Sequence, residues 1–316
     1  MGTPAFAVPP LEQLLQEGYK VVGVCTQPDR PAGRGRAVVA SAIKVYASQH
    51  GLAVFQPASL RDPGIHRDLV SLAPDIIVIA AYGRILPMEV LNLTKWGCVN
   101  IHPSLLPLHR GPSPVVATLI EGDKVAGVTV MALDEGMDSG PIIAQAEEPI
   151  QPEDTAGTLT DRLFQRGAQL LVRTLPLYVQ GEIVSVDQNE AQATYTQKVT
   201  KGDGVIDWDL PAVNIWRQVR AYWHWPGSYT RWRGRHLKVV DVTMPFGADG
   251  GAWIRSPLAL PGEVVLAENG SKETVGVVTG EGVLGLSRLQ LEGKKEVSAR
   301  EFLLGHEGFM GATLPS

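Results

Sequence analysis

The sequence contains little cysteine and no long apolar run. Its two cysteines, Cys25 and Cys98, each lie in an apolar, strand-like stretch and have no CxxC spacing. Such cysteines are expected to be buried free thiols of a reducing compartment, so neither a disulfide nor a zinc site is predicted. No stretch approaches the roughly eighteen apolar residues of a membrane helix, and no basic region followed by an apolar stretch opens the chain. We therefore expect a cytoplasmic protein without a membrane partner.

Net positive charge and the common nucleotide and metal motifs are also missing. The formal net charge is -5, which argues against indiscriminate binding to phosphate backbones, because such binding needs many positive contacts. A nucleic-acid partner would have to be held by local basic patches. No GxGxxG follows a predicted strand, and the sequence has neither a P-loop nor an HExxH motif. The sequence therefore predicts neither a dinucleotide cofactor nor a metal.

The length and composition fit a globular protein with two domains. The 316 residues exceed the usual size of a single core. A hydrophobic content of 44% with 19% charged residues is ordinary for such proteins. A polar, glycine-containing stretch at residues 194–209 marks a linker. We expect one domain over residues 1–193 and a smaller one over residues 210–316.

Helices and strands are predicted to alternate before the linker. Apolar residues at helical spacing predict helices at residues 9–18, 41–50, 65–73, 114–122 and 158–181. Apolar, β-branched runs predict strands at residues 20–26, 54–56, 75–81, 96–101 and 125–133. This alternation is typical of an α/β fold with a doubly wound, mostly parallel sheet.

The chain changes character beyond the linker. One helix is predicted at residues 211–222, and Ser298 and Glu301 have the capping-box spacing of a final short helix. Between them, glycine and proline separate short strand candidates at residues 227–232, 236–243, 262–267, 274–279 and 283–289. Five or so short strands suggest a small barrel, an architecture that often binds nucleic acid.

Polar groups gather where the strand at residues 96–101 meets a proline-broken loop. Asn100 and His102 are two residues apart, so their side chains lie on one face of a strand. Open α/β sheets place their chemistry beyond the carboxyl ends of the strands, and Asp138 of the acidic loop 133–141 can supply a third group.

Transfer of an acyl-type group to an amine suits this trio. The Asn100 amide and a protonated His102 can stabilise negative charge on the carbonyl oxygen, and Asp138 or His102 can accept the amine proton. The residues alone also fit a structural role, because an aspartate in a glycine-rich loop is usually a turn former.

A family resemblance changes the balance between these two interpretations. Residues 104–114, SLLPLHRGPSP, resemble the SLLP-x-x-x-G-x-x-P signature of the formyltransferases that use 10-formyltetrahydrofolate. The resemblance runs from Gly2 to about residue 305, with further blocks in TQPDRPAGRGR at residues 26–36, AAYGRILP at 80–87 and IDW at 206–208. Leu108 stands where an arginine or lysine is frequent, which removes a positive charge near the expected site.

The resemblance implies a site as well as a fold. Asn100, His102 and Asp138 match the catalytic positions of the family, and the second domain matches an OB-like barrel. The members that the chain resembles most act on initiator methionyl-tRNA, with 10-formyltetrahydrofolate as co-substrate. The folate is expected against Ser104, Leu105, Leu106, Pro107, Tyr82, Gly83 and Asp134. The tRNA is expected to contact Arg30, Arg34 and Arg36 of the first arginine-rich loop and Arg231 and Arg235 of the second domain.

The four tryptophans around those last arginines have two interpretations. Arginine interleaved with aromatic residues can offer phosphate contacts and stacking platforms. We expect the tryptophans to belong mainly to the domain core, and the arginines to neutralise tRNA charge rather than read bases. The four residues are Trp216, Trp223, Trp225 and Trp232.

Three alternatives stay open at this point. A formyltetrahydrofolate hydrolase and a formyltransferase for an amino sugar or a purine precursor belong to the same family. A non-catalytic folate- or RNA-binding module is less compatible with an intact catalytic trio. We also expect a monomer.

The start of the chain is a separate expectation. Family members carry an apolar strand of about five residues before the segment that matches Gly2, Thr3 and Pro4. We expect this form to be less stable than one extended upstream, because each buried large apolar side chain contributes about 1.5 to 3 kcal/mol. A true start with a rearranged sheet edge is the alternative.

Overall fold

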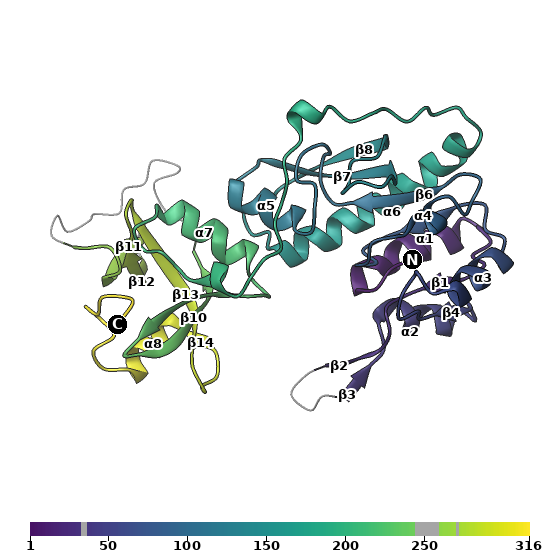
Figure 1. Cartoon of the computed structure of the whole chain (residues 1–316). Coiled ribbons are helices and arrows are strands. Elements are labelled where there is room, and N and C mark those ends of the chain that lie inside the picture. The colour runs from purple at the N-terminus through teal and green to yellow at the C-terminus, as the bar shows by residue number, and fades with distance from the viewer. Residues whose placement is uncertain (33–36, 244–258, 270–271) are drawn as a thin grey trace. The chain divides into compact units, whose positions relative to one another are not determined.

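Figure 1 shows the computed structural model, which describes residues 1–32, 37–243, 259–269 and 272–316. The chain forms two compact units. The first consists of Met1–Pro114, Lys124–Pro149 and Thr160–Gln197, and the second of Val115–Asp123, Ile150–Leu159 and Lys198–Ser316. The units are therefore not two consecutive halves of the sequence.

The helices of the α/β region begin and end close to the predicted positions. Ser41 caps one of them, because its side chain accepts a hydrogen bond from the backbone N–H of Lys44 at 3.3 Å. Gly18, with a φ of 78°, follows the end of the first. The helices are α1 (Val8–Gln16), α2 (Ala42–Gln49), α3 (Pro63–Ser71), α4 (Met88–Leu91), α5 (Pro114–Glu121) and α6 (Ala156–Val179). Of these helices, only the short α4 was not predicted from the spacing of the apolar residues.

The central sheet of the first unit is mixed, so the prediction of a mostly parallel sheet is wrong in this respect. Its strand order is β5 (Ile77–Ile79), β6 (Cys98–His102), β7 (Val125–Ala132) and β8 (Ile142–Pro149). β5 and β6 are parallel, whereas β6–β7 and β7–β8 are antiparallel. The acidic loop joins β7 to β8 directly, because antiparallel neighbours need no crossover helix. Strand β8, which is only partly buried, was not predicted.

A two-stranded parallel pair, β1 (Val24–Cys25) and β4 (Val54–Phe55), completes this region. Gly2 links it to the central sheet: its N–H donates to the Cys25 carbonyl at 3.0 Å, and it forms a parallel bridge with Ala80. A cavity of about 660 Å³ borders this junction, lined mostly by apolar groups of residues 19–25 and 72–78 and of neighbouring helices. An additional strand ahead of Gly2 stays a prediction.

Helix α6 approaches the central sheet closely. A Cβ on its Gly167 would lie 2.6 Å from Cγ2 of Ile101 and 2.8 Å from Cγ2 of Val128, so glycine allows this contact. Ile101 of β6 and Val128 of β7 are both fully buried in the core below the helix. This packing fixes the strand on which the candidate catalytic side chains stand.

The second unit is mainly antiparallel. Its strand order is β11–β12–β13–β10–β9, and β14 pairs with β13. Ser298 and Glu301 form the predicted capping box at the last helix. No pairing of β9 with β11 occurs within the described ranges, so barrel closure is not observed there. The elements are α7 (Ala212–Ala221), β9 (Ser228–Trp232), β10 (Arg235–Val242), β11 (Val264–Asn269), β12 (Lys272–Val278), β13 (Val283–Leu291), β14 (Val297–Ser298) and α8 (Ala299–Gly305).

The four tryptophans of the second unit differ in burial. Trp232 is buried and Trp216 packs against the core, as expected. Trp223 and Trp225 are 47% and 55% exposed, so the core interpretation is wrong for these two. In the part of the chain that the structure describes, no helix is both long and apolar enough to cross a membrane.

Candidate active site

Strand β6 carries Asn100 and His102 to the edge of the site. His102 pairs in register with Thr129 of β7, and Asn100 lies between Ile79 of β5 and Met131 of β7. The two side chains share a face, as the spacing predicts. His102 is 4% exposed, whereas Asn100 is half-buried and makes no side-chain hydrogen bond to a described residue. The Asn100 amide is therefore available to a ligand.

Each ring nitrogen of the His102 imidazole faces a specific partner. Its Nε2 donates to the carbonyl oxygen of His109 at 3.1 Å, since a carbonyl can only accept. Its Nδ1 then faces Oδ1 of Asp138 at 3.6 Å. Burial lowers the pKa of His102, and the Asp138 carboxylate and the His109 carbonyl offset this only in part. The lowered pKa favours the neutral form of His102, in which Nδ1 is the atom that can take a proton.

Asp138 divides its two carboxylate oxygens between two partners. Oδ2 accepts a hydrogen bond from the backbone N–H of Gly111 at 2.8 Å, while Oδ1 faces His102. The Asp138 backbone has a φ of 53°, in the left-handed region that residues other than glycine rarely adopt. The structure therefore brings His102 and Asp138 together from segments 36 residues apart, on the same strand-end side as Asn100.

The expected folate loop after β6 is held by hydrogen bonds, most of them from residues of β7 and β8. The Ser104 hydroxyl donates to the Leu108 carbonyl at 2.7 Å. Thr129 donates to the Ser104 carbonyl and accepts from the Leu106 N–H, at 2.6 and 3.1 Å. Gln145 donates to the Leu106 carbonyl at 2.8 Å. Both backbone groups of Leu106 are therefore already bonded within the protein, and the sequence pattern did not single out Thr129 or Gln145.

The rest of this loop is fixed by packing and by one long-range bond. Leu105 fills the space beside Gly127, where a Cβ would come within 2.3 Å of its side chain. The Pro107 carbonyl accepts from the Thr194 N–H at 3.2 Å. The loop is thus a rigid wall.

Tyr82 and Gly83 form a second wall beyond β5. The Tyr82 side chain is 1% exposed, and its hydroxyl has no partner among the described residues. Gln27 donates to both carbonyls, at 2.9 Å for Tyr82 and 3.2 Å for Gly83. Gly83 has a φ of 76°. Gln27, which stands in the arginine-rich block, therefore holds the turn that follows β5.

Asp134 shapes the acidic loop from within. Its carboxylate accepts from the Gly136 N–H and from the Ser139 hydroxyl, each at 3.0 Å. The residue is exposed. This arrangement is an Asx turn, which leaves only part of the carboxylate free for a ligand.

The predicted tRNA-binding arginines fall in both units. Arg30 is exposed on the hairpin of β2 (Arg30–Ala32) and β3 (Ala37–Val39), a hairpin where a loop was predicted. Arg34 and Arg36 lie outside the described residues. In the second unit, exposed Arg231 donates to the Gly234 carbonyl at 3.0 Å, and exposed Arg235 donates to the Glu292 carbonyl at 2.6 Å.

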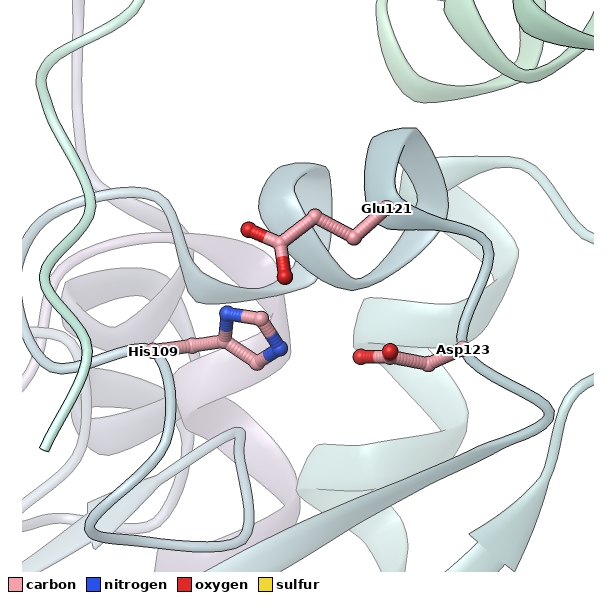
Figure 2. A group of neighbouring side chains, drawn as sticks. All are labelled: His109, Glu121 and Asp123. Atoms are coloured by element: carbon pink, nitrogen blue, oxygen red, sulfur yellow. The ribbon is translucent and has the colours of Figure 1, made fainter. Parts of the chain in front are cut away.

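Figure 2 shows three more side chains with metal-binding chemistry, His109, Glu121 and Asp123. His109 belongs to the first compact unit, and the other two belong to the second. Each of the three side chains belongs to a residue that interacts with another residue. Acidic groups of this kind are common without an ion, so we assign no metal site to them.

Comparison with known proteins identifies the fold and the family. Residues 1–175 match the family described as "Formyl transferase", and residues 198–307 match "Formyl transferase, C-terminal domain". The sugar 3N-formyl transferase WlaRD shares the fold, with a TM-score of 0.63 and 18% identity over 93% of this chain and 97% of that one. An N-formyltransferase from Helicobacter canadensis has a TM-score of 0.62 at 18% identity, over 90% and 97% of the two chains.

Sequence relatives are much more similar. A methionyl-tRNA formyltransferase of Roseiflexus sp. (strain RS-1) is 47% identical over 96% of this chain and 91% of that protein. One from Dehalococcoides mccartyi (strain ATCC BAA-2266 / KCTC 15142 / 195) is 44% identical over 99% of this chain and 97% of that protein. Such similarity over nearly the full length places the chain in the methionyl-tRNA formyltransferase family.

Proposed function

We propose that the chain transfers the formyl group of 10-formyltetrahydrofolate to the α-amino group of initiator methionyl-tRNA. The observation that carries the proposal is the pairing of His102 Nδ1 with Asp138 beside the free amide of Asn100. Similarity to methionyl-tRNA formyltransferases over nearly the full length of the chain supports the choice of acceptor. The reaction supplies formylated methionyl-tRNA for translation initiation, in the cytoplasm.

The three residues divide the chemistry between them. The amine nitrogen attacks the formyl carbon, and the Asn100 amide stabilises the negative charge that forms on the formyl oxygen. His102 accepts the amine proton at Nδ1, and Asp138 stabilises the resulting imidazolium. The carbon–nitrogen bond to the folate then breaks, and the proton passes to the leaving nitrogen, which yields tetrahydrofolate. Because burial lowers the pKa of His102, we favour this base role over a protonated His102 that polarises the formyl oxygen.

The binding surfaces follow from the same assignment. The folate would lie between the two loop walls, along Ser104, Leu105, Leu106 and Pro107 on one side and Tyr82, Gly83 and Asp134 on the other. Since the Leu106 backbone groups are bonded internally, recognition of the flat pterin there would rest on shape and apolar contact. The proposal needs no metal.

The tRNA would contact two basic surfaces. One is the hairpin with Arg30 and the arginines that follow it, and the other includes Arg231 and Arg235, which are exposed. We assign catalysis to residues 1–193, the linker to residues 194–209 and tRNA binding to an OB-like barrel at residues 210–316. We expect one copy of the chain to be sufficient for these tasks.

A single assay separates the candidate functions. The purified chain is incubated with 10-formyltetrahydrofolate and, in parallel, with charged initiator tRNA, free methionine, an amino sugar nucleotide or buffer alone. Formyl-methionyl-tRNA and tetrahydrofolate are expected in the first reaction only. Tetrahydrofolate in buffer alone would identify a hydrolase, product with the amino sugar would identify a sugar enzyme, and binding without any product would identify a non-catalytic module.

A further inference from the structure

Arg110 is a fully buried cation in the first unit, next to the residues that hold His102 and Asp138. Its Nε donates to Oε1 of Gln188 at 3.0 Å, and its two terminal nitrogens bind the Glu190 carboxylate at 3.0 and 2.7 Å. It also donates to the Tyr195 hydroxyl at 2.9 Å. A buried guanidinium needs such partners, so Arg110 ties residues 188–195 firmly to the site.

The orientation of the Gln188 side chain follows from this contact. A guanidinium only donates, so the amide oxygen of Gln188 must face Arg110 and the amide nitrogen must face away from it. That nitrogen donates to the carbonyl of Asp138 at 2.9 Å and to the carbonyl of Gly140 at 2.7 Å. Gln188 thus grips the acidic loop on both sides of Ser139.

These two hydrogen bonds hold a loop in which the backbone of Asp138 is strained. Asp138 has a φ of 53°, and a backbone in this region persists only where its surroundings hold it. The Gly111 N–H holds Oδ2 of the carboxylate, and Gln188 holds the backbone carbonyl. The remaining oxygen, Oδ1, then has little freedom except to face His102.

We propose that Gln188 is a positioning residue for the catalytic carboxylate of Asp138, and that Arg110 in turn orients Gln188. This inference rests on the proposed function in so far as Asp138 takes part in the transfer. Gln188 itself touches no reacting atom. Its effect is on the distance and angle between the carboxylate and the imidazole.

Three variants of the full chain test the proposal. Gln188→Leu removes both sets of bonds, and Gln188→Glu keeps an acceptor for Arg110 but loses the donors to Asp138 and Gly140. Gln192→Leu is the matched control, because Gln192 is exposed on the same segment and its side chain makes no hydrogen bond to a described residue. We expect kcat to fall about 10- to 100-fold in both Gln188 variants, with KM for folate and tRNA changed less than about three-fold. The control should keep wild-type kcat.

A second readout does not depend on turnover. The titration of His102 is followed by NMR in the full chain with labelled histidine. The groups that act on its pKa are Asp138, which raises it, and His109, whose charge lowers it while its carbonyl raises it. If Gln188 positions Asp138, Gln188→Leu moves the His102 midpoint to lower pH, whereas Gln192→Leu does not.

The outcomes separate this proposal from the proposed function. A wild-type chain without formyl transfer contradicts the function, while the His102 titration still tests the positioning. Unchanged kcat in the Gln188 variants overturns the positioning role. A lower kcat with an unmoved His102 midpoint also overturns it, because that result indicates a merely structural residue. If Gln188→Leu fails to fold, the kcat of the Gln188→Glu chain decides, since that variant retains the Arg110 contact.

Discussion

The backbone N–H of Gly111 binds Oδ2 of Asp138 at 2.8 Å, which leaves Oδ1 to face His102 at 3.6 Å. One carboxylate is thereby both anchored and kept available. An amide at this position would keep one acceptor oxygen but lose the negative charge.

Asp138→Asn should therefore lower turnover far more than substrate affinity. A positioned acid or base contributes roughly a hundred- to ten-thousand-fold in rate, so we expect kcat to fall within that range. Binding of the tRNA, measured by filter retention, should change less than about three-fold. Equal kcat for the two proteins would contradict the role of Asp138.

Asn100→Ala tests the oxyanion contact. The loss of one such donor typically costs roughly a hundred- to a thousand-fold in kcat, and we expect that loss here. Since the half-buried Asn100 side chain makes no hydrogen bond to a described residue, the free energy of unfolding should change by less than about 1 kcal/mol. Steady-state kinetics and urea titration measure the two effects, and a large loss of stability with normal kcat would argue for a structural asparagine.

The buried His102 predicts a pH dependence of stability. Burial lowers its pKa in the folded chain below the usual value of about 6.5, so the unfolded chain binds more protons in the range below that value. This contribution to stability is fully present above about pH 6.5 and is lost as the pH falls toward the folded pKa. Urea unfolding between about pH 5 and 7.5 should show the loss in the wild type, and a smaller one in His102→Gln. Parallel curves for the two would refute the assignment.

Gly167→Ala tests the contact between α6 and the sheet. The added Cβ would come within 2.6 Å of Ile101, and overpacking of this kind costs about 1 to 3 kcal/mol. Gly305→Ala, at the end of α8, is the control, because a Cβ there has nothing within 4 Å. Thermal melts should show a lower Tm for the first variant only.

The cavity at the Gly2 junction predicts a stabilising extension. The N–H groups of Val24 and Thr26 pair with β4, so the Cys25 N–H faces the opposite edge of β1, and Cys25 is one of the residues that line the cavity. A strand of about five apolar residues fused ahead of Met1 should raise Tm by several degrees, because each buried large side chain adds about 1.5 to 3 kcal/mol. A glycine–serine extension of equal length is the control. Equal Tm for the two would show that the cavity does not accept a strand.

Local sequence patterns predicted much of the fold but only part of the candidate site. The spacing of Asn100 and His102 and the capping box at Ser298 follow from strand and helix periodicity, which the sequence carries directly. The direction of β7 and β8 was not predictable, because the mainly polar second half of β8 weakens its apolar pattern and because pairing is a property of two strands. The hairpin of β2 and β3 at Arg30 was not predicted either, because it too depends on the pairing of two strands.

By itself, the sequence determined the order of most helices and strands, the strand end with its amide and imidazole, and the family resemblance that identifies the carboxylate of Asp138. Only the tertiary structure decided the tautomer of His102, the division of the Asp138 oxygens and the grip of Gln188 on the acidic loop. Those features join residues from segments far apart in the chain. They depend on a few hydrogen bonds closed by chain packing, and no local pattern records which distant groups will meet.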